Sequence, residues 1–455
     1  MEKKNTWETY SSKQLKELEK INAKYRDFLD NGKTERECID TIVNTIEKSG
    51  YRELESLIKE GAALKTGDKV YSVWMNKSIA MFQIGRKPMT EGMNILGAHI
   101  DSPRLDVKQN PLYEDGGFAY LDTHYYGGVK KYQWVTIPLA IHGVIVKKDG
   151  TCVEINIGEN EDDPVFFVSD LLIHLAQEQL EKKAAKVIEG EALDIIVGNK
   201  PLLIDKKDKK KDEKEAGKEA VKAGVLDILK ETYDIREEDF VSAELEIVPA
   251  GKAREAGFDR SMTLAYGQDD RVCAYTSMQA MLDSDVTDRT MCCILVDKEE
   301  IGSVGATGMQ SHFFENAVAE VMNLTGEYSE LHVRRCLAHS CMLSSDVSSA
   351  FDPTYASSFD KKNVAYLGGG MVINKFTGAR GKSGSNDANA EYLAHLRHIF
   401  DKAEVNFQTA ELGKVDLGGG GTIAYILALY GMNVIDSGVA VLNMHAPWEA
   451  TSKAD

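Results

Sequence analysis

Acidic residues and histidines follow several apolar stretches of this sequence, at positions where a buried strand would end. The stretch "NILGAHIDSPRLDVK" (residues 94–108) runs from an apolar segment straight into a histidine and an aspartate. In open α/β sheets the ligand crevice lies beyond the carboxyl ends of the strands, so polar residues just after apolar strands indicate a candidate site. Five places fit, and their residues are His99 with Asp101, Asp269 with Asp270, Glu299 with Glu300, Asp346, and His445.

The combination of these residue types predicts a metal site, although each residue taken singly has a simpler structural explanation. Two imidazoles and several carboxylates are ligands that a pair of borderline divalent cations prefers. Two such cations, about 3.5–4 Å apart, need a bridging carboxylate and further ligands on each side. The adjacent Glu299 and Glu300 can divide the work, since one can bind a metal while the other faces a water as general base.

Asp101 has a supporting role in this interpretation. It stands two residues after His99, and residues i and i+2 of an extended segment share a face. Asp101 can therefore accept a hydrogen bond from His99 and fix the orientation of the imidazole ring. The apolar stretch would end in polar groups because a metal and its support lie there.

The first 60 residues, which must lead into this site, are predicted to be helical. The segment "SSKQLKELEKINAKYRDFLD" (11–30) has apolar residues at helical spacing, Ser11 or Ser12 as a possible cap, and Asn31-Gly32 as an end signal. Short β-type runs follow in "KVYSVW" and "SIAMFQIG" before the stretch that contains His99.

The remaining sequence predicts an α/β domain that a second domain interrupts. From about residue 110 to 245 the chain becomes rich in glycine, aromatic residues and β-like runs. Helical and apolar β-type segments then alternate, which predicts a largely parallel sheet covered by helices. We expect a catalytic domain formed by residues 1–108 and 246–455, and a separate domain formed by residues 109–245.

Composition restricts the partners. The 455 residues carry 72 acidic and 54 basic side chains, a net charge of −18, which argues against nucleic acids and anionic membranes as partners. The charge run "KKDKKKDEKEAGKEAVK" (206–222) mixes both signs and predicts a solvated loop or exposed helix start. The N-terminus lacks the apolar core of a signal peptide, so we expect a cytoplasmic protein, and we interpret its seven cysteines as reduced core residues.

Six segments of the chain, taken together with their order along the sequence, resemble the M18 family of metalloaminopeptidases, the aspartyl aminopeptidases. The resemblance covers nearly the whole chain. It implies a zinc-peptidase α/β domain with a mostly parallel, covered sheet, interrupted by a β-rich dimerisation domain. The segments are "GAHIDSPRLDVK", "DDRVCAY", "DKEEIGS", "SSDVSSAFDP", "GGGGTIA" and "NMHAPWE".

The resemblance also implies the role of each site residue. His99 and Asp346 would bind one divalent metal ion, most simply Zn²⁺ with Co²⁺ or Mn²⁺ as alternatives, and Glu300 and His445 would bind a second. Asp270 would bridge the two ions; we choose it over Asp269 because the residue that follows it, Arg271, is polar and opens a helix. Glu299 would be the general base, and Asp101 would orient His99.

Substrate and assembly follow from the same resemblance. The substrates would be peptides with a free N-terminus, and family members assemble as homo-oligomers, dodecamers built from dimers. His174, in "VSDLLIHLA", resembles a histidine that a neighbouring subunit contributes to the active site. Lys382, in "GKSGSN", matches a basic position linked to acidic side chains of substrates, where an ion pair would give selectivity. A departure from the family pattern at "YQWVTIP" leaves that acidic preference open.

Two other classes of function stay open at this stage. A related co-catalytic metallohydrolase, such as a carboxypeptidase or deacylase, would use the same metals but bind the other end of its substrate. A non-catalytic assembly or cargo protein could keep the fold without the chemistry. Every proposed ligand and base position is occupied by a competent residue, which favours the peptidase.

Overall fold

The computed structural model describes residues 5–202 and 219–455. Their contacts divide the chain into two compact units. The main unit comprises the residues up to Ser102, Ala253–Met444 and Trp448–Asp455, and the inserted unit comprises Pro103–Lys252 with His445–Pro447. The boundaries expected from the sequence, after residues 108 and 245, fall a few residues from these divisions. The dimerisation role of the inserted unit stays a prediction.

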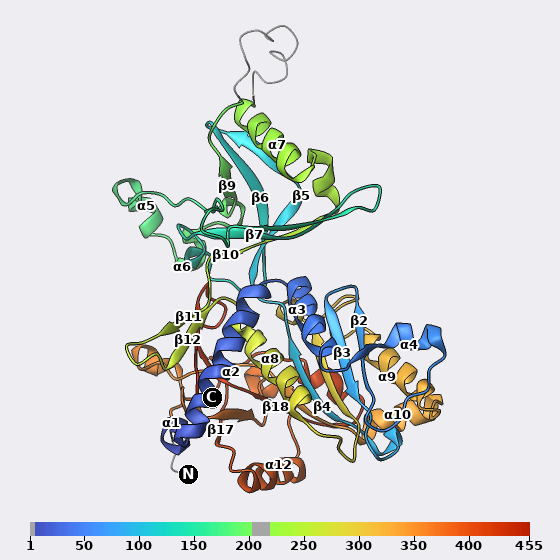
Figure 1. Ribbon diagram of the computed structural model, residues 1–455. Helices are drawn as coiled ribbons and strands as arrows, with labels where there is room; N and C mark the ends of the chain where they lie inside the picture. The colour runs from blue at the N-terminus through green and yellow to red at the C-terminus, as the bar shows by residue number, and fades with distance from the viewer. Residues whose placement is uncertain (1–4, 203–218) are drawn as a thin grey trace. The chain divides into compact units, whose positions relative to one another are not determined.

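A nine-stranded sheet forms the centre of the main unit (Figure 1). Its strands, in spatial order, are β1 (Arg52–Glu53), β2 (Lys69–Trp74), β3 (Ser78–Gln83), β13 (Met291–Val296), β4 (Asn94–His99), β14 (Cys341–Ser345), β18 (Asn433–Gly438), β16 (Met371–Asn374) and β17 (Phe407–Thr409).

The central strands of this sheet run in the same direction. Strand β4 is parallel to both of its neighbours, β13 and β14, and β14 is parallel to β18. Antiparallel pairs occur only where β3 meets β2 and β13 and where β16 meets β18. The largely parallel α/β sheet predicted from the sequence is confirmed, and the carboxyl ends of β4, β13 and β14 lie at one edge.

Helices cover both faces of this sheet. One apolar core contains residues of α4 (Leu54–Glu60), α9 (Phe313–Leu324), α10 (Glu330–His339) and α13 (Ala424–Ala428). A second core contains residues of α2 (Ser12–Asn31), α3 (Glu35–Glu47) and α8 (Gln268–Asp283). In β3, Ala80 and Phe82 join the first core while Ile79 and Met81 join the second. This alternation is that of a strand buried on both faces.

Helix α2 begins and ends where its sequence signals predict. The Ser11 side chain accepts a hydrogen bond from the Gln14 backbone N–H, and the Gln14 side chain accepts one from the Ser11 backbone N–H. This reciprocal pair satisfies two backbone donors that a helix N-terminus leaves open. The helix ends before Gly32, which confirms the predicted cap and stop.

Smaller elements complete the main unit. Helix α1 spans Thr6–Thr9, α11 spans Ala379–Lys382, and α12 spans Ala390–Lys402. A five-stranded sheet contains β11 (Arg254–Ala256), β12 (Met262–Ala265), β20 (Glu449–Ser452), β19 (Ala440–Leu442) and β15 (Ser348–Ser349). Five of the seven cysteines are buried and Cys341 is partly buried, but Cys152 is exposed, so the interpretation as core residues is wrong for Cys152.

The inserted unit contains a six-stranded sheet in which every neighbouring pair is antiparallel. The strands are β8 (Cys152–Ile157), β7 (Leu139–Val146), β10 (Ala243–Pro249), β5 (Arg104–Asp115), β6 (Phe118–Tyr126) and β9 (Ile195–Gly198). Helices α5 (Gln177–Leu180), α6 (Ala184–Val187) and α7 (Ala220–Tyr233) accompany the sheet (Figure 1).

The charge run and the helices bear on what the composition led us to expect. The charge run 206–222 lies mostly outside the described residues, and its last residues, from Ala220, belong to α7. Among the described residues, none of the helices combines the length and apolar character that crossing a membrane requires.

Candidate active site

His99 occupies the last position of β4, at the carboxyl edge of the central sheet. Its side chain is only 2% exposed, and its Nε2 atom lies 3.3 Å from a carboxylate oxygen of Asp269 and 4.0 Å from one of Asp346. His99, Asp269 and Asp346 each offer a ligand atom within 4.8 Å of the other two. One imidazole and two carboxylates are a donor set that fits zinc.

The structure places Asp269, and not Asp270, in this group. This geometry favours Asp269 over Asp270, the residue chosen from the sequence, as the bridging candidate. The choice of Asp270 rested on the polar Arg271 that follows it and opens a helix, but the backbone of both aspartates is non-helical although they lie within the bounds of α8. Asp270 is fully buried, and burial raises the pKa of its carboxyl well above the usual value, as it also does for Asp346.

Asp269 also approaches a second candidate ligand, Glu300. The two residues offer carboxylate oxygens within 4.8 Å of one another. Because Asp269 has two carboxylate oxygens and neighbours both His99 and Glu300, its position suits the bridging role that a two-metal site requires.

Glu299 and Glu300 begin a single 3₁₀ turn, Glu299–Ile301, that follows β13. The Glu299 carboxylate lies 4.0 Å from His99 Nε2, and its side chain is 14% exposed. Glu299 therefore borders the ligand group and still reaches solvent, as a general base that acts on water must.

Asp101 connects the two sides of the site. Its backbone oxygen lies 3.0 Å from His99 Nδ1 and its carboxylate 3.3 Å, so an Nδ1–H can donate to Asp101 while Nε2 faces the other ligands. The same carboxylate accepts hydrogen bonds from the backbone N–H groups of Glu299 and Glu300, both at 3.1 Å. Asp101 thus holds the turn that carries both glutamates as well as the imidazole.

Glu449, on β20, is a supporting residue that the sequence interpretation did not assign. Its side chain is 1% exposed, and its Oε2 accepts a hydrogen bond of 2.9 Å from the backbone N–H of Asp269. On the other side, Ser102 Oγ donates to the Asp269 backbone oxygen at 2.7 Å. The only available signal was the position of Glu449 four residues after His445, in the segment "NMHAPWE".

The electrostatics of the site indicate an excess of negative charge. Burial, together with the negative charges of Asp270, Asp269 and Glu299, raises the pKa of Asp346 well above its usual value. Burial alone would lower the pKa of His99, but hydrogen bonds to Asp101 and Asp269 and the charge of Glu299 raise it well above the usual value. A bound cation would offset this repulsion and favour the ionised carboxylates.

His445 belongs to the short segment His445–Pro447, which is part of the inserted unit. There its Nδ1 lies 2.9 Å from the backbone oxygen of Gly128, so an Nδ1–H can donate and leave Nε2 as the ligand nitrogen. Met444 before this segment and Trp448 after it both belong to the main unit. The assignment of His445 as a metal ligand stays a prediction.

The two residues predicted to bind substrate differ in their surroundings. His174 lies in an exposed 3₁₀ turn, Ile173–Leu175, in the inserted unit. Lys382 ends α11, where its Nζ donates to Asp387 at 3.0 Å and lies 3.9 Å from the ring centre of Phe376. Neither substrate role is tested by these contacts.

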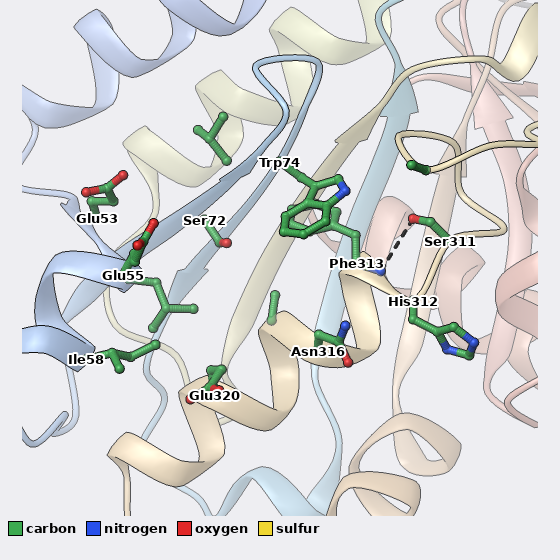
Figure 2. Close-up of a pocket in the computed structure, with 14 residues that line it drawn as sticks. Glu53, Glu55, Ile58, Ser72, Trp74, Ser311, His312, Phe313, Asn316 and Glu320 are labelled. Carbon is green, nitrogen blue, oxygen red and sulfur yellow. Dashed lines mark hydrogen bonds between the residues drawn. The ribbon is translucent and has the colours of Figure 1, made fainter.

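A separate pocket of about 400 Å³ lies between α4, β2 and α9 (Figure 2). The Trp74 and Phe313 rings stack there with centres 6.1 Å apart, and Glu53, Glu55 and Glu320 line the same pocket. The residues predicted to bind metal or substrate are absent from this lining. The chemistry described above does not use it.

Comparison with known proteins agrees with this fold and donor set. A family model described as "Aminopeptidase I zinc metalloprotease (M18)" matches residues 28–455. A curated relative from Clostridium acetobutylicum, named "Probable M18 family aminopeptidase 1", is 63% identical over 454 residues and covers 100% of this chain and 96% of its own length.

Solved structures of M18 aminopeptidases are also similar to this chain. The crystal structure of an M18 family aminopeptidase from Thermotoga maritima has a TM-score of 0.93 at 44% identity, covering 100% of this chain and 96% of that chain. A structure described as the mApe1 dodecamer of S. cerevisiae has a TM-score of 0.75 at 20% identity, covering 96% and 93%. The latter shows likeness of fold alone.

A mixed α/β sheet with imidazole and carboxylate donors at its strand ends, together with these matches, defines a zinc metallopeptidase. More specifically, the chain belongs to the M18 peptidase family and is an aminopeptidase.

Proposed function

We propose that this aminopeptidase uses two zinc ions, with Asp269 as the bridging ligand. His99 and Asp346 would hold one ion, and Glu300 and His445 the other. The observation that carries the proposal is that the Asp269 carboxylate neighbours both His99 with Asp346 and Glu300. When bound, the ions would activate a water and polarise the scissile carbonyl.

The residues around the ligands supply the proton transfers. Glu299 would take a proton from the attacking water and pass it to the leaving amine, since its carboxylate is both next to the ligand group and partly exposed. Asp101 would keep Glu299 in place through the backbone N–H that it binds. The negative charge of the site would favour the α-ammonium or amine end of a peptide over its carboxylate end.

The negative charge of the site separates the aminopeptidase from a carboxypeptidase, which needs a cationic group for the substrate's terminal carboxylate. Lys382 is the residue that we propose as the partner of a substrate carboxylate, and we assign it to the acidic side chain of an N-terminal residue. Its Nζ already pairs with Asp387. A substrate carboxylate would therefore have to replace Asp387, which predicts a modest acidic preference.

We also propose a homo-oligomer, with the dodecamer as its expected form. The supporting feature is an apolar surface on the inserted unit around His174, formed by exposed side chains. These are Val165, Phe167, Leu171, Leu172, Ile173, Leu175 and Leu180. Several exposed apolar side chains within one short stretch, residues 165–180, favour a protein interface there. In a second copy, His174 would contribute to the neighbouring active site. The cytoplasmic location stays a prediction.

The test is release of free amino acids from peptides with free and N-acetylated ends, with and without chelator, for the wild type and Glu299→Gln. We expect hydrolysis only of free N-termini in zinc-loaded protein. Glu299→Gln should keep its zinc, measured by elemental analysis, and lose at least about 100-fold in kcat, since positioned acid–base groups contribute 10²–10⁴-fold. Unchanged turnover would remove Glu299 as the base, and no hydrolysis by zinc-loaded wild type would favour an assembly or cargo protein.

A further inference from the structure

A second set of polar side chains is buried in the main unit and contains none of the proposed zinc ligands. Its centre is Asp436 on β18. In the register of the sheet, Ser344 of β14 and Asn374 of β16 are the direct partners of Asp436. Paired residues of neighbouring strands point to the same face of a sheet, so these three side chains share one face.

The loop before α13 covers this face. Thr422, at the end of "GGGGT", donates a hydrogen bond from its hydroxyl to Asp436 Oδ1. The backbone N–H of Gly420 in the same loop donates to the Thr377 backbone oxygen at 3.0 Å. Thr377 therefore lies beside the loop that contacts Asp436. We call Ser344, Asn374, Thr377, Thr422 and Asp436 the Asp436 cluster.

Four oxygen atoms of the Asp436 cluster are buried without a hydrogen-bond partner among the described residues. They are Ser344 Oγ, Asn374 Oδ1, Thr377 Oγ1 and Asp436 Oδ2. The four side chains are 0%, 5%, 7% and 1% exposed, respectively. Buried polar atoms are nearly always satisfied in folded proteins, so a bound water or ion is expected in contact with these oxygens.

The Asp436 cluster also contains a single formal charge. Burial raises the pKa of the Asp436 carboxyl to about 7, and the Thr422 hydrogen bond opposes this shift. In the described part of the chain Asp436 forms no ion pair with a lysine, arginine or histidine. A buried carboxylate of this kind either takes up a proton or is balanced by a cation.

We propose that the Asp436 cluster binds one monovalent cation, Na⁺ or K⁺, through these oxygens. One carboxylate balances one positive charge, whereas a divalent ion would leave a net charge in a buried site. Carboxylate, amide and hydroxyl oxygens are hard ligands that replace the hydration shell of such ions. A proton on Asp436 would supply only one hydrogen bond and leave the remaining oxygens unsatisfied. The bound ion would fix the "GGGGT" loop against the sheet.

The test compares thermal unfolding of zinc-loaded, full-length protein in choline chloride, NaCl and KCl at one ionic strength. A ligand that binds only the folded state raises Tm in a saturable way. We expect NaCl, KCl or both to raise Tm saturably relative to choline chloride, and the effective salt identifies the ion. Asp436→Asn should abolish this dependence or shift its midpoint by at least about tenfold in concentration.

Asp455→Asn is the matched control. Burial also raises the pKa of the Asp455 carboxyl to about 7, but its two oxygens accept hydrogen bonds of 2.9 Å from Gly368 and Gly370. Asp455→Asn should therefore keep the cation dependence of the wild type. If Asp455→Asn also loses the dependence of Tm on the cation, the loss in Asp436→Asn would reflect general destabilisation. That result would overturn the proposal.

Two other outcomes would also overturn it. Equal Tm values in all three salts would mean that water alone fills the Asp436 cluster, and an unchanged salt response in Asp436→Asn would place the ion elsewhere. If Asp436→Asn does not fold, Ser344→Ala and Thr377→Val decide, because each removes one oxygen without changing the charge. A higher midpoint concentration in these variants supports the site, and the wild-type midpoint contradicts it. The readout does not depend on peptidase activity.

Discussion

Glu449 should control zinc affinity although it is not proposed to touch zinc. Its buried carboxylate accepts the backbone N–H of Asp269 at 2.9 Å. Glu449→Ala would leave that N–H unpaired beside the carboxylate that we propose as the bridging ligand. A hydrogen bond to a charged group contributes about 1.5–3 kcal/mol, and about 1.4 kcal/mol corresponds to a tenfold change in affinity. If losing this hydrogen bond displaces the Asp269 carboxylate from its zinc-binding position, the zinc Kd should rise roughly 10- to 100-fold. This is the range typical of residues that support metal ligands.

The assay is zinc competition against a chromophoric chelator, with circular dichroism to confirm folding. Glu449→Gln keeps an acceptor oxygen and should lie within a few-fold of the wild type. Asp239→Ala is a control in the inserted unit, since Asp239 is also buried and accepts one backbone N–H, that of Arg236, at 2.8 Å. It should lower stability and leave zinc affinity unchanged. A wild-type zinc Kd for Glu449→Ala, or an equal loss in Glu449→Gln, would refute this reasoning.

Three further predictions concern other parts of the chain. His445→Ala should lower zinc content toward one ion per chain, measured by elemental analysis, and two retained ions would count against His445 as a ligand. His174→Ala should reduce kcat without changing Tm, because the side chain is exposed, and a wild-type rate would contradict its role. Asp455 has a pKa of about 7 in the folded chain against about 3.9 when unfolded, so the folded state binds the proton more tightly and loses stability as pH rises from about 4 to 7. Asp455→Asn should make the unfolding free energy fall less over this range in urea titrations, and slopes equal to the wild type would show that Asp455 does not titrate there.

Much of the fold was predictable because local signals agree with the tertiary structure. The capped helix α2 and the strands β2 and β3 follow from apolar periodicity and end signals. Strand β18 was missed because its sequence "NVIDSG" includes polar residues. Those residues are buried by neighbouring strands and a loop, which no local window of the sequence reveals.

The site was predictable as a set of residue types and less so in detail. Strand ends identified His99, the Glu299–Glu300 pair and Asp346 without reference to distances. The choice between Asp269 and Asp270 depends on backbone dihedral angles at the start of α8, which the sequence pattern does not specify. Supporting contacts such as that of Glu449 join residues about 180 positions apart, and pairing at such a separation leaves no periodic trace in the sequence.

The position of β4 has a consequence for how the chain folds during synthesis. The strand ends at His99, yet the strands on either side of it, β13 and β14, begin only at Met291 and Cys341. At ribosomal rates of 5–20 residues per second, β4 therefore waits roughly 10–40 s for its first neighbour. All six strands of the inserted sheet lie between Arg104 and Pro249, so that sheet can pair during the delay. The nascent chain must keep an apolar strand from aggregating meanwhile, which makes β4 a candidate contact for ribosome-associated chaperones.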